Sequence, residues 1–269
     1  MKTPDPNLPT VPADIYTREY FERGCGGHEE FARSHGRDLP LRLQITFELA
    51  DIGPGKRVLD LGCGRGEVVL HCAERGALVW GLDYAIEGLR LARTALAPNA
   101  GEATRARLAL QHANARQLPL STGSVDVVFM VDVVEHLYPH ELAEAFAEVR
   151  RVLRPGGRLV VHTSPSLWYY RFGYPLYRLV QRLRGQKLPR DPRDRWMLLR
   201  EMHVNEQTPP RLRQVMRQQG FAARVWLRTT HTYDYEANDI VRWGMRVLTS
   251  VYPFRWIFCD DIFAIGTKA

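Results

Sequence analysis

A glycine-rich stretch between two apolar patterns constrains this chain more than any other feature. Residues 58–61 form a short apolar run with an acid near its end, and Gly62, Gly64 and Gly66 follow at alternate positions. Residues 68–70 then begin an apolar pattern that suits a helix. Glycine adopts positive φ at low cost and lets a backbone approach a ligand closely. The stretch therefore predicts a buried parallel strand, a tight turn and a helix N-terminus.

Two ligand classes compete for such a turn, and a turn without a ligand is the third possibility. A dinucleotide-binding turn has the pattern Gly-x-Gly-x-x-Gly, but Glu67 occupies the position of the third glycine. The pattern acid-x-Gly-x-Gly-x-Gly is met in full by Asp60-Leu61-Gly62-Cys63-Gly64-Arg65-Gly66. This stretch resembles motif I of the class I S-adenosylmethionine-dependent methyltransferases. The pyrophosphate of a dinucleotide binds at an anion-binding helix N-terminus. The sulfonium and amino acid moiety of S-adenosylmethionine are instead compatible with a neighbouring acid.

A second acid follows at the end of the next predicted strand, residues 77–83. Asp83 lies about 20 residues past Gly62, where an acid binds ribose hydroxyls in nucleotide-binding folds. The methyltransferase resemblance implies the same role for Asp83, with Tyr84 packing on the adenine. The alternative is that Asp83 caps a helix over residues 85–97.

A third strand is predicted at 108–112, and the loop after it carries the next motif. Asn114-Ala115-Arg116-Gln117-Leu118-Pro119-Leu120 resembles the family's Asp-Ala-x-x-Leu-Pro-Phe loop, whose first residue accepts a hydrogen bond from the adenine amine. An amide oxygen can also accept this bond. The alternative is that Asn114 only builds a turn.

Three histidines are candidates for a general base, which methyl transfer needs only when the acceptor is protonated at neutral pH. His136 belongs to residues 124–137, which are predicted to be the fourth strand and its exit. This stretch resembles the family's motif that opens onto cofactor and substrate, with Val131 as a cofactor contact. His162 ends the strand after Leu-Arg-Pro-Gly-Gly (153–157), a sequence characteristic of the family. His203 begins a His-x-x-Glu-x-Thr-Pro element in which Thr208 and Pro209 predict a helix start.

Metal binding is not predicted by the acids and histidines after the fourth strand. Asp132, Glu135, His136 and His140 form Asp-x-x-Glu-His-x-x-x-His, which is neither the His-Glu-x-x-His zinc motif nor its inversion.

The resemblance covers about residues 41–165 and 203–267 and implies a fold. We expect an α/β, seven-stranded, mostly parallel Rossmann-like sandwich with strand order 3-2-1-4-5-7-6, in which the last strand, over 258–267, is antiparallel. Residues 1–40 are expected to form a leader, disordered to about residue 14, and lid helices. Residues 41–269 are expected to form the S-adenosylmethionine-binding domain, with helical and aromatic lid inserts at 166–200 and 231–256.

Positive charge is concentrated in the first insert. The net charge of the chain is +7, and residues 166–200 hold nine Lys/Arg against two Asp, so the rest of the chain is neutral. The apolar residues at 176, 179, 180 and 183 share one face of a predicted helix. Three interpretations remain open: a lid with a solvated basic face, a helix at an anionic membrane surface, or a surface for single-stranded nucleic acid.

Several classes of protein are disfavoured by composition. No apolar run approaches the ~20 residues of a membrane span, the first ten residues do not resemble a signal peptide, and the four cysteines form no Cys-x-x-Cys. A cytoplasmic protein is expected, with possible peripheral contact at the inner membrane surface.

The expected activity is methyl transfer from S-adenosylmethionine to a small-molecule, glycan or lipid-linked acceptor, by O-methylation. Gly-Cys-Gly-Gly-His-Glu-Glu-Phe at 24–31 is loosely similar to methyltransferases of bacterial cell-surface glycan and lipid pathways. An RNA methyltransferase is the rival, although no Asn/Asp-Pro-Pro-Tyr/Phe follows the fourth strand. Outside the methyltransferases, the sequence also allows a nucleotide-sugar- or NAD-binding oxidoreductase, or a non-catalytic binding module.

Overall fold

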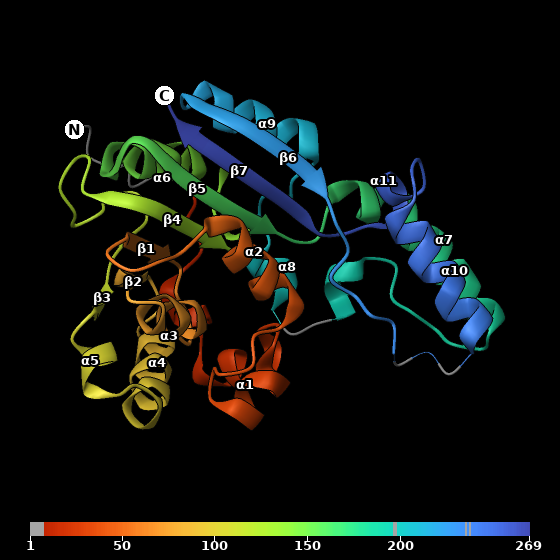
Figure 1. Cartoon of the computed structure of the whole chain (residues 1–269). Helices are drawn as coiled ribbons and strands as arrows, with labels where there is room; N and C mark the ends of the chain where they lie inside the picture. The colour runs from red at the N-terminus through yellow and green to blue at the C-terminus, as the bar shows by residue number, and fades with distance from the viewer. Residues whose placement is uncertain (1–7, 196–197, 235, 237) are drawn as a thin grey trace.

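One sheet of seven strands organises the molecule (Figure 1). The computed structural model describes residues 8–195, 198–234, 236 and 238–269. The strand order is β3-β2-β1-β4-β5-β7-β6, and β7 pairs antiparallel with both of its neighbours while the other pairs are parallel. The expected fold class and strand order are therefore confirmed. The strands are β1 (Arg57–Leu61), β2 (Leu78–Asp83), β3 (Leu108–His112), β4 (Val125–Val131), β5 (Leu153–Thr163), β6 (Phe221–Leu227) and β7 (Ile262–Lys268).

Alternation along the strands divides the core into two layers. Successive side chains of a strand point to opposite faces of a sheet, and in β1 Val58 joins one buried cluster while Leu59 joins the other. The cluster of Leu59 packs against α6 (Pro139–Val152) and α9 (Pro209–Gln218). The cluster of Val58 packs against α2 (Leu41–Ala50), α3 (Glu67–Glu74) and α4 (Ile86–Asn99). Figure 1 shows these two sets of helices on opposite sides of the sheet.

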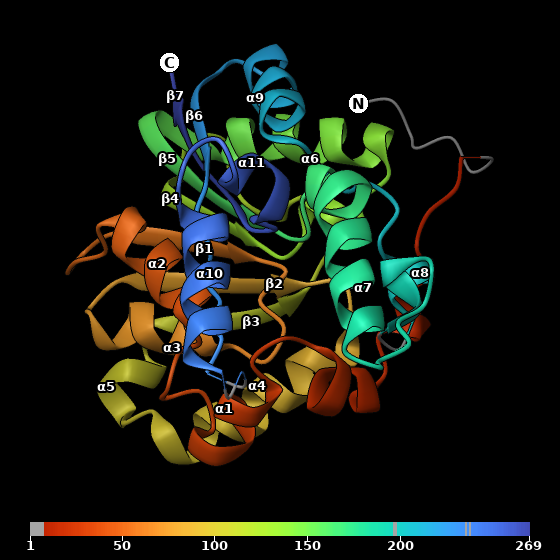
Figure 2. The same cartoon turned by 90° about the vertical axis from the view of Figure 1, so that its right-hand side faces the viewer.

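Two groups of helices lie outside this sandwich. The N-terminal group is η1 (Ala13–Ile15), η2 (Tyr20–Gly24) and α1 (His28–Ser34). The second group, which we call the lobe, consists of η4 (Tyr169–Gly173), α7 (Tyr174–Leu183), α10 (Asp239–Ser250) and α11 (Arg255–Phe258). Figures 1 and 2 show the lobe projecting beyond the end of the sheet. The short elements that remain are α5 (Glu102–Arg105), η3 (Val134–His136), η5 (Pro192–Arg195) and α8 (Leu199–Met202).

The sequence-based boundaries hold for most elements and fail at two places. Residues 8–14 make specific contacts although most of them are exposed: Val11 is buried, and Thr10 Oγ1 donates to Glu141 Oε1 at 2.7 Å. Residues 1–7 of the predicted leader lie outside the described residues. The last strand begins at Ile262 instead of 258, because α11 occupies the residues up to Phe258. The cap of α9 is confirmed, since Thr208 accepts from the backbone N–H of Arg211.

No described helix combines the length and the apolar character that a membrane crossing requires.

Candidate active site

The glycine turn connects β1 to α3 and brings the backbone close to other elements. Gly62 and Gly66 have φ of 78° and 83°. A Cβ atom on Gly62 would lie 2.3 Å from Cγ2 of Val133, in the segment after β4, and one on Gly66 would lie 3.0 Å from Cβ of Ala92 in α4. Gly62 is therefore required for the approach of the turn to the end of β4, and Gly66 for the packing of α3 on α4.

Asp83, at the end of β2, holds the glycine turn in place. Its Oδ2 accepts from the backbone N–H of Gly64 and its Oδ1 from that of Ala85, both at 2.7 Å. Burial raises the pKa of Asp83, while these backbone donors oppose the shift. Each carboxylate oxygen accepts more than one hydrogen bond, so Asp83 can fix the turn and the approach to α4 and still accept hydroxyl donors from a ligand.

A pocket opens where β1, β2 and β4 end. β1 lies between β2 and β4, so the pocket occupies the point at which the strand order reverses, where open α/β sheets bind ligands. The structure brings nine of the ten predicted cofactor-binding residues into its lining: Asp60, Gly62, Cys63, Gly64, Asp83, Tyr84, Asn114, Ala115 and Val131. The tenth, Gly66, is not among the lining residues and serves the helix packing described above.

Asn114 builds a turn at the edge of the pocket. Its Oδ1 accepts from the backbone N–H of Arg116 at 2.9 Å, which forms a turn. The residue also lines the pocket, and an amide oxygen has a second lone pair. The hydrogen bond to an adenine amine stays a prediction.

Asp60 is a buried acid without a partner. The residue is 3% exposed, and among the described residues its carboxyl has no hydrogen bond or ion pair. Burial, followed by the charges of Glu67 and Asp83, raises its pKa to about 8. A cationic group in the pocket would supply the partner that the carboxyl lacks.

The N-terminal segment lies along one side of the pocket, in the part of the chain (residues 1–40) for which lid helices were expected. Tyr16, Tyr20 and Phe21 line it. Arg65 of the glycine turn donates to the backbone oxygens of Phe21 and Gly26 at 2.9 and 2.8 Å, and the arginine is 3% exposed. The aromatic residues around Gly24–Gly27 were the only sequence signal for this contact.

A network of charged side chains links α2 to the ends of β4, β5 and β7 at the pocket. Arg42 Nε donates to Asp132 Oδ2 at 2.7 Å, and His162 lies between two carboxylates, with Nδ1 2.5 Å from Asp132 Oδ1 and Nε2 3.2 Å from Asp261 Oδ1. Burial alone would lower the pKa of His162, but Asp132 and then Asp261 raise it to about 10. His162 is therefore protonated at neutral pH with both nitrogens engaged, a geometry that favours a structural role over that of a base.

Of the three predicted bases, only His136 lines the pocket. Its Nδ1 lies 3.1 Å from the Tyr16 hydroxyl, and its ring meets that of His203 edge to face, with centroids 4.9 Å apart. Burial lowers the pKa of His136 to about 4 and that of His203 to about 2. Both rings are therefore neutral at physiological pH. The catalytic role of either histidine stays a prediction.

Known proteins similar in sequence to this chain include methyltransferases. Residues 59–161 match the family described as "Methyltransferase domain". An uncharacterized methyltransferase of Synechocystis is 34% identical over 129 residues, which are 47% of this chain and 57% of that protein. A ubiquinone biosynthesis O-methyltransferase of Sodalis glossinidius is 35% identical over 134 residues, 48% of this chain and 51% of that protein. The chain thus spans a little more than half the length of these relatives.

A solved structure agrees on the fold. Phosphoethanolamine N-methyltransferase 2 of Haemonchus contortus, in complex with S-adenosyl-L-methionine, has a TM-score of 0.60 at 16% identity, covering 93% of this chain and 59% of that one. The sheet and the pocket at its switch point define the class of Rossmann-like nucleotide-binding folds. Within that class, the chain carries a class I S-adenosylmethionine-dependent methyltransferase domain.

Proposed function

We propose that the chain transfers a methyl group from S-adenosylmethionine, bound in the strand-end pocket, to a hydroxyl of a small lipid-linked acceptor. The pocket itself is the observation that supports this proposal most directly. It gathers the motif residues from the ends of β1, β2, β3 and β4 around Asp60, a buried acid that has no partner among the described residues. The ammonium group of the amino acid moiety and the ribose hydroxyls match Asp60 and Asp83, so the residues present fit this cofactor.

The chain's own contribution to such a reaction is alignment and exclusion of water. Bound S-adenosylmethionine supplies the methyl group as an electrophile. The glycine turn and Asp83 hold one side of the pocket, and Tyr16, Tyr20 and Phe21 cover another. His136 places a neutral imidazole, which can accept a proton or bind a cation, at the pocket wall.

Cofactor affinity should depend on pH through Asp60. The raised pKa of about 8 means that Asp60 is mostly protonated at pH 6 in the free protein. A cationic ligand favours the ionised form, so binding releases a proton and affinity for S-adenosylmethionine should rise between pH 6 and pH 8. The increase is at most about tenfold per pH unit for one proton, and it should level off above pH 8. Calorimetry across this range gives the affinities.

Asp60→Asn is the control, because the ligand's own amino group titrates equally in both proteins. The difference between the two pH profiles therefore reports on Asp60. The variant should bind more weakly than the wild type at pH 8 and have the flatter profile. Identical slopes for the two proteins would remove Asp60 from the cofactor site.

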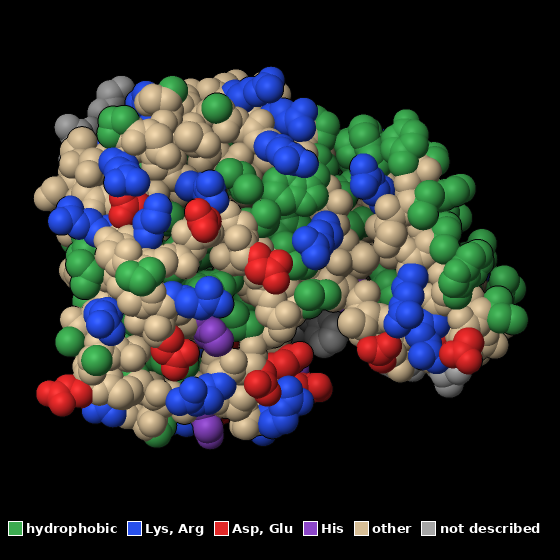
Figure 3. Space-filling model, viewed as in Figure 1, with side chains coloured by type: hydrophobic (Ala, Val, Ile, Leu, Met, Phe, Trp, Pro, Cys, Tyr) green, Lys and Arg blue, Asp and Glu red, His purple; other side chains and the backbone are tan. Residues whose placement is uncertain are grey.

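The lobe suggests where the acceptor comes from. The apolar face predicted for α7 does not pack on the sheet: Leu179 is 54% exposed and Leu183 is 81% exposed. In α10, Ile240 is 80% and Trp243 is 67% exposed. Figure 3 shows hydrophobic side chains gathered over the lobe, with Lys and Arg side chains beside them. Exposed apolar side chains beside basic ones on helices are typical of a protein that lies at an anionic membrane surface.

Ion pairs neutralise some of the positive charge in the segments next to the lobe. Arg184 pairs with Glu236 at 2.8 Å, and Arg193 and Arg200 pair with Asp191 and Asp194. Arg178 and Arg182 on α7 have no ion-pair partner among the described residues. These two arginines are therefore available to anionic lipid headgroups.

Binding to vesicles should depend on both features of the lobe. We expect the wild type to sediment with vesicles that contain phosphatidylglycerol, and less so at high salt, because salt screens exposed charges. Leu179→Glu with Leu183→Glu should abolish binding, and Arg178→Gln with Arg182→Gln should weaken it most at low salt. S-adenosylmethionine affinity should stay within about 0.5 kcal/mol in all variants, as for distant surface changes.

Arg57→Gln with Arg93→Gln is the matched control, since both arginines are exposed and lie outside the lobe. This variant loses the same charge and should bind vesicles like the wild type. Sedimentation with single-stranded RNA but not with vesicles would support the rival acceptor class. A concentration-dependent dimer that the Leu→Glu variant dissolves would show that a second copy covers the lobe instead.

A further inference from the structure

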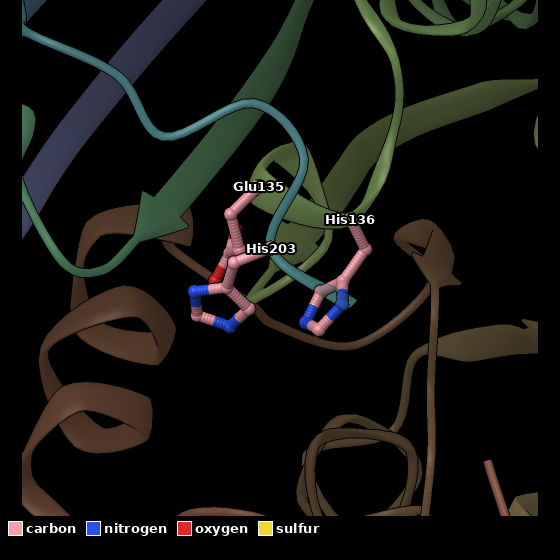
Figure 4. A group of neighbouring side chains, drawn as sticks. All are labelled: Glu135, His136 and His203. Atoms are coloured by element: carbon pink, nitrogen blue, oxygen red, sulfur yellow. The ribbon is translucent and has the colours of Figure 1, made fainter. Parts of the chain in front are cut away.

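Glu135, His136 and His203 form a cluster at the wall of the pocket. Each of them offers one ligand atom, and these atoms all lie within 4.8 Å of one another. Figure 4 shows Glu135 and His136 leaving the turn after β4, while His203 arrives from a separate segment. We propose that these three residues bind a divalent transition-metal ion, for which Zn²⁺ is the best match.

The ligand types favour zinc over the alkaline-earth ions. Zn²⁺ is commonly held by imidazole nitrogens and carboxylate oxygens, and catalytic zinc sites use three protein ligands and keep one position open. Mg²⁺ and Ca²⁺ prefer oxygen ligands, and two of the three side chains here offer nitrogen. The cluster thus has the composition and the number of ligands of an open two-histidine, one-carboxylate site.

An unpartnered nitrogen supports the proposal independently of the cluster geometry. The residue His203 is 7% exposed, and its Nδ1 is buried without a hydrogen-bond partner among the described residues. A buried polar atom left without a partner costs free energy. Figure 4 shows the His203 ring beside the Glu135 carboxylate, and one nitrogen of that ring is among the three ligand atoms of the cluster. A bound cation would give it a partner.

Backbone hydrogen bonds join the two segments that carry the ligands. The carbonyl oxygen of Glu135 accepts from the N–H groups of Val204 at 3.0 Å and Asn205 at 3.1 Å. Asn205 Nδ2 in turn donates to the backbone oxygen of Leu137 at 2.9 Å. His203 is therefore held against Glu135 and His136 although 67 positions separate the two histidines in the sequence.

Hydrogen bonds from neighbouring residues orient two of the three proposed metal-binding side chains. Thr163 Oγ1 donates to Glu135 Oε2 at 2.7 Å, which leaves Oε1 for an ion. The Tyr16 hydroxyl lies 3.1 Å from His136 Nδ1. Partners of this kind fix the orientation of metal ligands, and their loss typically costs about 10–100-fold in metal affinity.

The position of the cluster suggests a role that rests on the proposed methyl transfer. His136 lines the same pocket as Asp60 and Asp83. Because His136 lines the pocket, an ion held by the three residues would lie at the pocket wall and would supply a Lewis acid that favours the ionised form of an acceptor hydroxyl. Metal binding itself does not depend on that role.

A second group, His231, Asp260 and Asp261, also has ligand atoms within 4.8 Å. Its one nitrogen ligand is already engaged, since His231 Nε2 lies 3.1 Å from Asp260 Oδ2, and Asp261 accepts from Thr230 and contacts His162. Asp260 Oδ1 is buried without a partner among the described residues, but the other ligand atoms of the group are carboxylate oxygens. We therefore use this group as the internal control and not as a site.

The test begins with protein stripped by a chelator and measures Zn²⁺ binding by equilibrium dialysis with elemental analysis. We expect one Zn²⁺ per wild-type chain. His203→Gln and Glu135→Gln should weaken binding by more than 100-fold, and Thr163→Val by about 10–100-fold. His231→Gln should leave it unchanged. With Co²⁺ as a spectroscopic probe, visible absorption bands of the bound ion should appear in the wild type and in His231→Gln but be lost in His203→Gln.

Three results would overturn the site: no Zn²⁺ bound by folded wild-type protein, undiminished binding in His203→Gln, or loss in His231→Gln alone. Circular dichroism and calorimetry with S-adenosylmethionine show whether each variant is folded. The failure of the site is distinguishable from that of the proposed function. Zinc bound through His203 without S-adenosylmethionine binding would leave the metal site standing and end the methyltransferase proposal.

Discussion

Replacing His162 by Leu should lower the free energy of unfolding by about 3–5 kcal/mol. The side chain is fully buried between Asp132 and Asp261. Leu has a similar volume but removes the positive charge and both hydrogen bonds, which leaves Asp261 buried without its cationic partner. Removal of one partner from a buried ion pair typically costs this amount. Chemical denaturation monitored by circular dichroism gives the value.

The matched control is Asp239→Asn, which breaks the ion pair with Arg242 on the exposed face of α10. The Asp239 side chain is 91% exposed, and such pairs contribute at most about 1 kcal/mol. A loss of similar size in both variants would contradict the structural role of His162.

The stability contributed by His162 should also depend on pH. Its pKa is raised from 6.5 to about 10 in the folded protein. The contribution is therefore fully present below pH 6.5 and is lost as the pH rises towards 10. The difference in unfolding free energy between the wild type and His162→Leu should shrink across this range, and a constant difference would show that the ring is neutral.

Asp83→Ala should weaken S-adenosylmethionine binding by about 1–3 kcal/mol, or about 5- to 150-fold. The change removes the acceptor predicted for the ribose hydroxyls, and it leaves the Gly64 and Ala85 N–H groups without the carboxylate that holds the glycine turn. Calorimetry with the cofactor measures the loss.

Asp83→Asn separates the charge from the hydrogen bonds. The amide keeps one acceptor oxygen, so this variant should bind the cofactor more tightly than Asp83→Ala and more weakly than the wild type. Wild-type affinity in both variants would remove Asp83 from the site.

The sheet and the cofactor pocket could be predicted because their signals are local. A parallel strand buried on both faces appears as a short apolar run, as in Val125–Val131. The glycine turn is specified within seven consecutive residues, and the acid at Asp83 ends its own strand. Known strand order then brings these local motifs to one edge of the sheet.

The charged network under the pocket could not be predicted, because its partners are distant in sequence. Arg42 and Asp132 are 90 positions apart, and His162 and Asp261 are 99 apart. His162 was therefore a plausible base from the sequence alone, since nothing nearby indicates that carboxylates occupy both nitrogens. The contact of Thr10 with Glu141 was missed for the same reason, because the two residues are 131 positions apart.

The lobe shows what a local sequence pattern cannot predict. The helical periodicity of residues 176–183 correctly predicts a helix with one apolar face. Periodicity does not say what covers such a face, and a lid over the pocket was the default expectation. Leu183 is instead 81% exposed, which is why a membrane surface enters the proposed function.

The central claim is that the strand-end pocket binds S-adenosylmethionine, and calorimetry on the wild-type protein tests it most directly. We expect one molecule of S-adenosylmethionine or of its demethylated product to bind per chain, and no measurable heat from NAD. Tight binding of NAD with no signal from S-adenosylmethionine would contradict the account.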